Sequence, residues 1–502
     1  MKILKITLAI NLALGLSMFF IGISISMLAI FSICTIINII GIYDIIQSKH
    51  TIMKNYPIVG RFRWLAEELR PKIAQYFIEN DLNGTPINRE DRSVVYQRSK
   101  LESDKVPFGT QLDVYKNGYE FIAQTIFPSN ISDIPEPRIL IGSDKIKNKY
   151  SASILNISAM SYGALSSNAV ISLNTGAKMG NFYHNTGEGG ISPYHKKGGD
   201  LVYQIGTGYF GCGSTINGKQ IFDIVKFKET FDSTPTIKMI EIKISQGAKA
   251  AHGGVLPAKK NTEEIANIRG VEKGIEIISP AKHSAFNNFV ELLDFITILR
   301  TATDFNIPIG IKMCVGDISE LYDMLDTFKK NDNYPDFITI DGGEGGTGAA
   351  PIEFTNSVGM PLYDALPLVK KGLIDRDLHQ IKIITSAKVM TAFDIIKMLA
   401  LGADAVNSAR AFLLSLGCIQ ARVCDKNTCP TGITTQNKNL VNGLDPEVKS
   451  VRVYNFHKET IKAVKELMTV FGITNTRDIS ADKIYRRVDD KIKNLHDIYL
   501  KR

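Results

Sequence analysis

The most strongly patterned part of the chain is its N-terminal region, where no charged residue occurs between Ile6 and Tyr43. A transmembrane helix needs about 20 apolar residues, so this stretch is long enough for two helices. Gly22 and Ser24 lie near its middle, where a turn would fall. A signal peptide would have a shorter apolar core and a small-residue cleavage site, and neither is visible. The pattern predicts a transmembrane helical hairpin over residues 1–47.

Basic residues flank this apolar stretch on both sides. They are Lys2 and Lys5 before it, and Lys49, Lys54, Arg61 and Arg63 after it. Lys and Arg near the ends of membrane spans tend to stay on the cytoplasmic side. We therefore expect the hairpin to lie in the inner (cytoplasmic) membrane, with the rest of the chain facing the cytoplasm. One long tilted span is the alternative, and it would export the main body of the chain.

The pattern of apolar and polar residues changes twice after the hairpin. Residues 48–145 mix helix-like and irregular stretches with Asn-Gly and Pro turn signals, and we expect them to connect the hairpin to the main domain and to pack on it. From Ser151 to Gly432, short apolar runs alternate with longer helical patterns. Eight runs alternating with helices predict an α/β fold, a (β/α)8 TIM barrel over residues 146–440. A doubly wound sheet is the alternative.

The eight runs are Ile154–Ala159, Phe182–Asn185, Lys238–Ile244, Ile275–Ser279, Pro308–Met313, Asp336–Asp341, Ile381–Thr385 and Asp404–Asn407. The helical patterns include Phe289–Ala302, Ile318–Lys329 and Thr391–Leu401. At or just beyond the runs' C-terminal ends lie Met160, Asn185, Lys243, Ser279, Lys312, Asp341, Ser386 and Ser408. Such positions line the active face of a barrel. Residues 441–502 are predicted to form a helical C-terminal tail, with helices at Val451–Val470 and Asp482–Tyr499.

Composition narrows the class of protein only slightly. The chain has 502 residues, of which 44% are hydrophobic, which is ample for a large core. Its net charge of +8 is modest and spread along the sequence, so we expect no nucleic-acid partner and instead a surface near an acidic membrane. Six cysteines are too few for a disulfide framework and fit a reducing compartment.

Half of those cysteines lie close together. Cys418, Cys424 and Cys429 have the spacing C-x5-C-x4-C, and Pro430 follows the last of them, as in ferredoxin-type sequences. An odd number argues against disulfides alone, which leaves buried structural cysteines or a metal centre. Three thiolates suit a 3Fe–4S cluster, and a fourth ligand from elsewhere would suit a 4Fe–4S cluster.

Glycine and hydroxyl residues follow the later predicted strands. The segment Asp341–Gly348 reads DGGEGGTG, but the acidic residue that a dinucleotide site needs at a strand end is missing. The loops Thr385–Lys388 and Asn407–Arg410 combine hydroxyls with a cation after strands 7 and 8, where barrels often bind phosphate. Two ordinary helix caps are the alternative. A phosphate-bearing cofactor beside an iron–sulfur centre suggests FMN.

Three charged residues in other loops complete the candidate site. Glu188 lies between glycines in NTGEGG, where packing would not require a carboxylate. Lys249 and Arg269 would clamp a dicarboxylate if both reach the barrel mouth. Without that context, Glu188 is a solvated loop carboxylate, and Lys249 and Arg269 are surface charges.

The motifs together resemble one family. SAMSYGALS (158–166), NTGEGG (185–190), KISQGAK (243–249), GGEGGTGAAP (342–351) and LGCIQARVCDKNTCPTGITTQ (416–436) look like the synthase domain of glutamate synthases over roughly residues 105–440. With the hairpin, the chain resembles stand-alone FMN-binding glutamate synthase family proteins. The resemblance implies a (β/α)8 barrel that holds FMN and a 3Fe–4S cluster.

Site residues follow from the resemblance by motif. The cluster ligands would be Cys418, Cys424 and Cys429. Those holding FMN would be Ala159, Met160, Ser161, Gly163, Gln246, Lys312, Gly343, Gly345, Gly346, Thr347, Gly348, Ser386, Ala387, Ser408 and Arg410. The substrate, 2-oxoglutarate or a related oxo acid, would meet Glu188, Lys249 and Arg269, with Ser161 nearby. Val255 stands where the family commonly has a side-chain amide, which bears on the choice of oxo acid.

The reaction implied is reductive amination of 2-oxoglutarate to L-glutamate, which makes the chain an oxidoreductase acting on CH-NH2 groups. The family's glutaminase cysteine is not found at the start, so ammonia would come from solution or from a partner. A separate donor, a ferredoxin or a reductase subunit, would supply electrons. Two other functions stay open: a membrane-tethered electron-transfer flavoprotein, and a subunit of an N-methylglutamate-type synthase.

Overall fold

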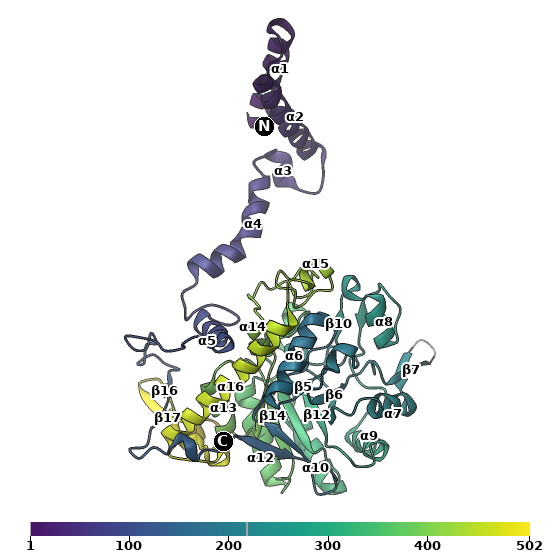
Figure 1. Ribbon diagram of the computed structural model, residues 1–502, viewed down its shortest axis with the longest axis vertical. Coiled ribbons are helices and arrows are strands. Elements are labelled where there is room, and N and C mark those ends of the chain that lie inside the picture. Colours follow the sequence, from purple (N-terminus) through teal and green to yellow (C-terminus); the bar gives the residue numbers. More distant parts are fainter. Residues whose placement is uncertain (1, 217–218, 502) are drawn as a thin grey trace. The chain divides into compact units, whose positions relative to one another are not determined.

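The computed structural model describes residues 2–216 and 219–501 (Figure 1). The chain divides into two compact units, Met1–Arg89 and Glu90–Arg502. The first unit holds the apolar helices, and the second holds a closed barrel of parallel strands with its covering helices. Each unit is described below by itself.

The first unit begins with two apolar helices, α1 (Lys2–Ile21) and α2 (Ile25–Ile46). Both are long and apolar enough to cross a membrane, and most of their side chains are exposed. The hydroxyl of Thr7 donates to the side chain of Asn38 at 2.6 Å, which pairs the start of α1 with the later part of α2. The predicted helical hairpin is therefore confirmed, and its insertion into a membrane stays a prediction.

The end of α2 is joined to the helices that follow, α3 (Thr51–Asn55), α4 (Arg61–Ile73) and a π-helical turn (Ala74–Ile78). The side chain of Asp44 in α2 is fully buried and pairs with the Arg61 guanidinium at 2.6 Å. The backbone N–H of Ile58 donates to the same carboxylate at 2.9 Å. These contacts fix the first residue of α4 against the last turn of α2.

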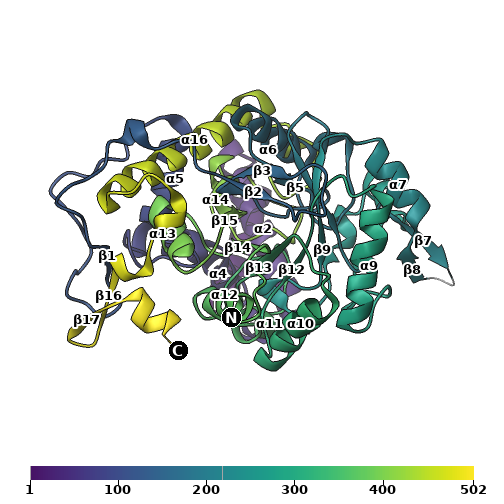
Figure 2. The same cartoon turned by 90° about the horizontal axis from the view of Figure 1, so that it is seen from below.

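The second unit is built on eight parallel strands that close into a barrel in the order β12-β13-β14-β15-β4-β5-β6-β9 (Figure 2). Its strands are β4 (Leu155–Ile157), β5 (His184–Asn185), β6 (Leu201–Ile205), β9 (Ile237–Lys243), β12 (Ile309–Met313), β13 (Phe337–Asp341), β14 (Lys382–Ser386) and β15 (Ala405–Ser408). The predicted barrel class is confirmed, and seven of its strands coincide with predicted runs.

One predicted strand is wrong. Within the run Ile275–Ser279, only β11 (Ile277–Ile278) is extended, and it pairs antiparallel with β10 (Val255–Leu256) outside the barrel. The exposed side chain of Ile278 shows why the run does not belong to the core. The third barrel strand is instead β6, whose five residues are all buried and which pairs with β5 and β9.

Helices cover the outside of the barrel (Figure 2). They are α6 (Ser167–Gly180), α7 (Ile224–Asp232), α9 (Phe289–Ala302), α10 (Ile318–Asn331), α12 (Leu362–Asp375), α13 (Ala392–Ala400) and α14 (Arg410–Ser415). Two shorter helices, α8 (Glu263–Arg269) and α11 (Ile352–Ser357), lie in the connections that follow β9 and β13. The three helical patterns that the sequence predicts coincide with α9, α10 and α13. The long α16 (Pro446–Phe471) packs against α6, α13 and α14 and so fills the place after β15.

The tail differs in part from its prediction. Its helix α16 contains the predicted Val451–Val470, but Asp482–Tyr499 is not one helix. That segment contains the hairpin β16 (Ile484–Val488) and β17 (Lys491–Asn494) and a π-helical turn (His496–Leu500). The hairpin pairs through β16 with β1 (Glu120–Ile122), and Arg486 and Lys397 both form ion pairs with the half-buried Glu120.

The remaining elements are short. They are α5 (Arg89–Lys100), the strand pair β2 (Arg138–Ile141) and β3 (Tyr150–Ser153), the hairpin β7 (Gly213–Ile216) and β8 (Lys219–Phe222), and α15 (Lys438–Val441). β2 and β3 pair antiparallel just before the first barrel strand.

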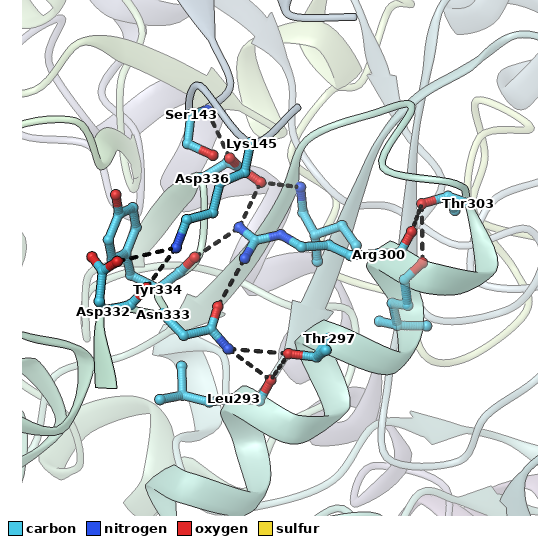
Figure 3. Close-up of polar contacts among 12 residues, drawn as sticks. Ser143, Lys145, Leu293, Thr297, Arg300, Thr303, Asp332, Asn333, Tyr334 and Asp336 are labelled. Atoms are coloured by element: carbon cyan, nitrogen blue, oxygen red, sulfur yellow. Dashed lines mark hydrogen bonds and ion pairs between the residues drawn. The ribbon is translucent and has the colours of Figure 1, made fainter. Parts of the chain in front are cut away.

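A buried ion pair organises the end of the barrel where the strands begin (Figure 3). Asp336, just before β13, pairs with Arg300 of α9 at 3.1 Å, and both side chains are buried. Its carboxylate also accepts the backbone N–H groups of Ser143 and Ile309, at 2.7 and 2.9 Å. One carboxylate therefore joins the β2–β3 loop, a covering helix and two strands.

Candidate active site

The opposite end of the barrel, where the strands finish, gathers most of the predicted site residues. Glu188 follows β5, and its carboxylate pairs with the ammonium group of Lys243, the last residue of β9, at 2.9 Å. Both side chains are largely buried, with 14% and 9% exposed. Glu188 is therefore not a solvated loop carboxylate. From the sequence, Lys243 was predicted only to lie at the end of a strand, and its ion pair with Glu188 was not predicted.

Two glycines make room for these contacts. A side-chain carbon at Gly254 would lie 1.8 Å from a carboxylate oxygen of Glu188, and one at Gly247 would lie 1.8 Å from the carbonyl oxygen of Gly342. Any other residue at either position would clash, so the glycines permit close approach of the loops. The loop KISQGAK therefore touches the glycine-rich loop after β13, as a shared site requires.

Lys249 and Arg269 lie at the same place and are buried, with only 1% and 5% of their surface exposed. The ammonium of Lys249 donates to the carbonyl of Ala349 at 2.7 Å. The guanidinium of Arg269 donates to the carbonyl of Tyr162 at 3.2 Å and stacks over the ring of Phe210. Its Nε atom is buried and has no hydrogen-bond partner among the described residues. Neither residue is a surface charge.

The electrostatics of this cluster are dominated by burial and by an excess of cations. Burial alone would raise the pKa of Glu188, but the charges of Lys243, Arg269 and Lys249 lower it overall. Burial and the nearby Lys243 lower the pKa of Lys249 to about 8. Burial likewise lowers the pKa of Arg269 to about 10, against the opposing effect of Glu188. The cluster holds three cations and one carboxylate.

A second pair lies beside this cluster. Burial would lower the pKa of Lys312, but Asp341 and Glu241 raise it overall, and the Lys312 and Asp341 side chains are 3.4 Å apart. Asp341 also accepts the backbone N–H of Gly247 at 2.9 Å. Inside the barrel, Glu241 accepts hydrogen bonds from side chains of three other strands, Asn185, Gln204 and Thr339. These carboxylates hold the floor of the site in place.

The predicted flavin residues come from several loops at the same face. The turn containing Ala159, Met160, Ser161 and Gly163 follows β4, and Ser161 lies 3.4 Å from Arg269. The amide nitrogen of Gln246 is buried and has no hydrogen-bond partner in the part of the chain that the structure describes. Ser386 bonds the hydroxyl of Ser158, and Ser408 donates to the carbonyl of Val389.

Two cations, Arg410 and Lys388, lie beyond the last strands, where the charge of Glu344 acts on both of them. Arg410 donates to the backbone of Glu344 at 3.5 Å, and Lys388 lies close enough for Arg410 to lower its pKa, after the larger effect of burial. Neither side chain has an ion-pair partner among the described residues. Ala387 lies between these loops, next to Ser386. The location suits an anionic group such as phosphate.

The glycine-rich loop bridges the two halves of the site. The backbone N–H of Gly343 donates to Met360, and that of Gly345 donates to Gly342. Gly346 lies against the Arg410 guanidinium, while Thr347 is exposed. A side-chain carbon at Gly348 would be 3.7 Å from the β-carbon of Cys424. The predicted flavin loop therefore reaches the cysteine segment.

The three cysteines are unpaired thiols and lie near one another. Burial, with smaller contributions from Cys424 and Cys429, raises the pKa of Cys418 to about 11. At Cys429 burial opposes ionisation, but hydrogen bonds led by that of Thr431, 3.3 Å away, lower the pKa overall. Among the described residues, no group of three or more His, Cys, Asp or Glu side chains is arranged to hold a metal ion. The donor chemistry of the trio suits iron.

Two residues that the sequence did not single out tie the cysteine segment to the flavin turn. Gln436 donates to the carbonyls of Gly163 and Leu165, at 3.0 and 2.8 Å. The buried ammonium of Lys260 donates to the carbonyls of Ala164 and Cys424. A Gln and a Lys in polar loops carry no pattern of their own, so only the fold reveals these contacts.

Comparisons with known proteins match this architecture. The family model described as the conserved region in glutamate synthase matches residues 124–474. A glutamate synthase large subunit-like protein of Bacillus subtilis (strain 168), YerD, is 36% identical, and the match covers 91% of this chain and 94% of that protein. An archaeal-type glutamate synthase (NADPH) of Thermotoga sp. (strain RQ2) is 32% identical over 65% of this chain, which spans only 60% of that relative.

Solved structures match less closely. The recombinant flavin-binding domain of baker's yeast flavocytochrome b2 aligns with 79% of this chain and 79% of its own at 11% identity, with a TM-score of 0.44. That score is too low to bear on function.

Proposed function

We propose a function for this chain from one established premise: it belongs to the glutamate synthase family. Within that family, it would act as a flavin- and iron–sulfur-dependent oxidoreductase. Its reaction would be reductive amination, in which 2-oxoglutarate, ammonia, two electrons and two protons give L-glutamate and water. The fold, the buried cluster at the barrel mouth and the cysteine segment each support part of this proposal.

The number of charged side chains around Glu188 is the observation that supports a dicarboxylate as the substrate. Lys243, Lys249 and Arg269 contribute three buried positive charges against the one carboxylate of Glu188, whose side chain is 14% exposed. An uncompensated buried charge is costly, so a site with two excess cations favours a dianion. A dicarboxylate such as 2-oxoglutarate brings two negative charges and would balance the cluster.

The residues present fit FMN. The partnerless amide of Gln246 offers a buried hydrogen-bond donor, and Arg410 and Lys388 offer an anion site beyond β14 and β15. Lys312, the turn from Ala159 to Gly163 and the loop from Gly343 to Gly348 would complete the surroundings. When bound, FMN supplies hydride chemistry to the substrate carbon.

The chain's own side chains have separable roles in this proposal. Lys249 and Arg269 would bind the two carboxylates and so hold the oxo carbon in one orientation, which contributes through positioning. Glu188, kept ionised by Lys243, would hold or accept a proton at the amine nitrogen. Ser161, next to Arg269, would help fix the nearer carboxylate.

The cysteines would hold a 3Fe–4S cluster. Support comes from three free thiols that are near enough to influence one another's pKa and that adjoin the flavin loop at Gly348. Such a cluster stores single electrons, so a ferredoxin or a reductase subunit is the proposed donor. Ammonia would come from solution or from a supplying partner. The apolar hairpin would hold the protein at the cytoplasmic membrane, with the barrel in the cytoplasm.

The deciding experiment is anaerobic turnover of the purified protein with a chemical reductant. We expect L-glutamate to form only when 2-oxoglutarate and ammonium are both present. No glutamate from protein with full flavin and iron content would overturn the proposal. A faster reaction with methylamine than with ammonium would instead identify an N-methylglutamate-type synthase.

A binding measurement separates an enzyme from a pure electron carrier. We expect 2-oxoglutarate to perturb the flavin absorption spectrum, and Arg269→Gln to abolish the perturbation while the flavin stays bound. Arg376→Gln is the matched control, because Arg376 directly follows α12 and pairs with Asp326 of α10, and neither residue belongs to the site loops. An electron carrier would show no perturbation in any of the three proteins.

A further inference from the structure

The helix that follows the apolar hairpin has an apolar face that is exposed within its own unit, among the residues that the structure describes. From α4 into the π-helical turn, Phe62, Leu65, Leu69, Ile73 and Phe77 recur at spacings of three and four residues, which places them on one face. All five are exposed, Phe77 to 85% and Phe62 to 65%. Neither helical element contains a buried residue. A face of this size needs a partner.

Charges are distributed around this face in a regular way. At about 100° per residue, Arg70 and Lys72 lie about 80° on either side of the centre of the face, and Arg61 and Arg63 lie about 100° away. Glu67 and Glu68 lie further round, on the opposite side. Cations at the boundary of an apolar face can extend their head groups to phosphates while their stems cover apolar surface. Glu67 and Glu68, at about 140° and about 120° from the centre of the face, lie further from it than any of these four cations.

The position of the helix in the chain points to what covers the face. Arg61, the first residue of α4, is paired with the buried Asp44 near the end of α2, and Ile58 donates to the same carboxylate. The helix therefore starts where the second apolar helix ends. If α1 and α2 span a bilayer, α4 begins at its surface.

We propose that residues 61–78, here called the surface segment, lie in the cytoplasmic face of the membrane. The apolar face would enter the boundary between head groups and acyl chains, and Arg61, Arg63, Arg70 and Lys72 would contact acidic phospholipid head groups. This inference rests on the membrane anchoring proposed above and adds a second, lipid-selective contact to it. The alternative occupants of the face are a second copy of the chain or its own barrel unit.

Tryptophan fluorescence in vesicles tests the proposal, because the chain has one tryptophan, Trp64. Trp64 lies on the polar side of the surface segment and packs on the ring of His50. The full-length protein would be reconstituted into phosphatidylcholine vesicles with or without phosphatidylglycerol, each with brominated acyl chains. The probes are Leu69→Trp and Phe77→Trp, each combined with Trp64→Phe. The controls are the unaltered protein and Glu67→Trp combined with Trp64→Phe.

We expect both apolar-face probes to shift to shorter wavelength and to lose at least half of their emission to brominated lipid, more strongly with phosphatidylglycerol. The two controls would lose little. A probe that shifts to shorter wavelength without quenching would mean that protein covers the face, and it would overturn the proposal. Equal quenching at positions 67 and 69 would also overturn it. Failure of the protein to float with vesicles would overturn the membrane anchoring itself, and this outcome is separate from the others.

Discussion

The two ends of the barrel each contain a buried ion pair, but they are built differently. Where the strands begin, Asp336 meets one cation, Arg300, and two backbone N–H groups (Figure 3). Where the strands end, Glu188 meets Lys243 and shares its surroundings with two further buried cations, Lys249 and Arg269. The Asp336–Arg300 pair is balanced in charge, whereas the cluster of Glu188, Lys243, Lys249 and Arg269 holds two more cations than carboxylates.

The difference separates stability from binding. A balanced, hydrogen-bonded ion pair holds elements together and needs no bound ligand to neutralise its charge. Like charges that are buried together oppose folding, and they persist only if a ligand or the chemistry needs them. The same side-chain types therefore serve the fold at one end and, in our proposal, a dianionic substrate at the other.

The largest expected effect is on stability at the balanced end. Replacing Asp336 with Ala should lower the free energy of unfolding by about 3–5 kcal/mol, because Arg300 would stay buried without its partner. Urea unfolding followed by circular dichroism measures this. Asp332→Asn is the matched control, since Asp332 contacts Lys145 with an exposed carboxylate and should change stability by less than about 0.5 kcal/mol. If both variants lost similar amounts of unfolding free energy, Asp336 would not be a special stabilising residue, and the proposed difference between the two ends of the barrel would be wrong.

The next effect is on activity at the charged end. Arg269→Lys should lower kcat/KM for the dicarboxylate about a hundredfold, or ~2.7 kcal/mol, because an ammonium cannot replace a guanidinium that grips a carboxylate at two points. Steady-state kinetics with a chemical reductant checks this, with the unfolding midpoint measured in parallel. A variant that is destabilised but binds substrate normally would show that Arg269 serves the fold.

A pH dependence should appear at the charged end. The pKa of Lys249 is lowered to about 8, so its charge is present below that pH and is lost above it. Dicarboxylate binding should therefore weaken as the pH rises through about 8, and Lys249→Arg should flatten the profile. In the free protein, the unfolded chain holds more protons on this group between about 8 and 10.5, so its contribution to stability should rise with pH there. Titration of the flavin perturbation with 2-oxoglutarate at several pH values provides the test.

The smallest expected effect is a change in stability at Lys249, and it tests most directly whether the two ends of the barrel differ. Lys249→Met should raise the stability of the ligand-free protein by about 1 kcal/mol, since it removes a buried cation that is repelled by Lys243. The same change should abolish stabilisation by added 2-oxoglutarate. Thermal unfolding with and without the oxo acid measures both. A less stable Lys249→Met protein would mean that the cations at this end are structural.

The sequence predicted the barrel well because most of its strands are apolar runs separated by helices. It failed at β6 because the connection from β5 contains only a short 3-10 turn, Pro193–His195, and no helix marks the boundary. It failed at Ile275–Ser279 because a short apolar run looks the same in a barrel strand and in a loop excursion. The tail segment Asp482–Tyr499 was misread because its hairpin is short and charged.

Site prediction had a similar limit. The rule that polar residues after strands face the active end placed Lys243 and Lys312 there, and the glycine-flanked motif NTGEGG singled out Glu188. The cysteines were singled out by their spacing, and their role as cluster ligands stays a prediction. The partner of Glu188 could not be predicted, since Lys243 lies on another strand and the pairing depends on the closure of the barrel. Likewise, the link from Gln436 to Gly163 joins segments far apart in the chain.

The hydrogen bonds from Gln436 to the turn after β4 limit which insertions and deletions the cysteine segment can accept. The Gln436 amide holds the turn after β4, while Cys429 stands only a few residues earlier in the same segment. A deletion or insertion between Cys429 and Gln436 would pull the amide away from both carbonyls. If Cys429 holds the proposed cluster, the length of this loop is constrained at both ends, and variation in loop length should avoid residues 429–436.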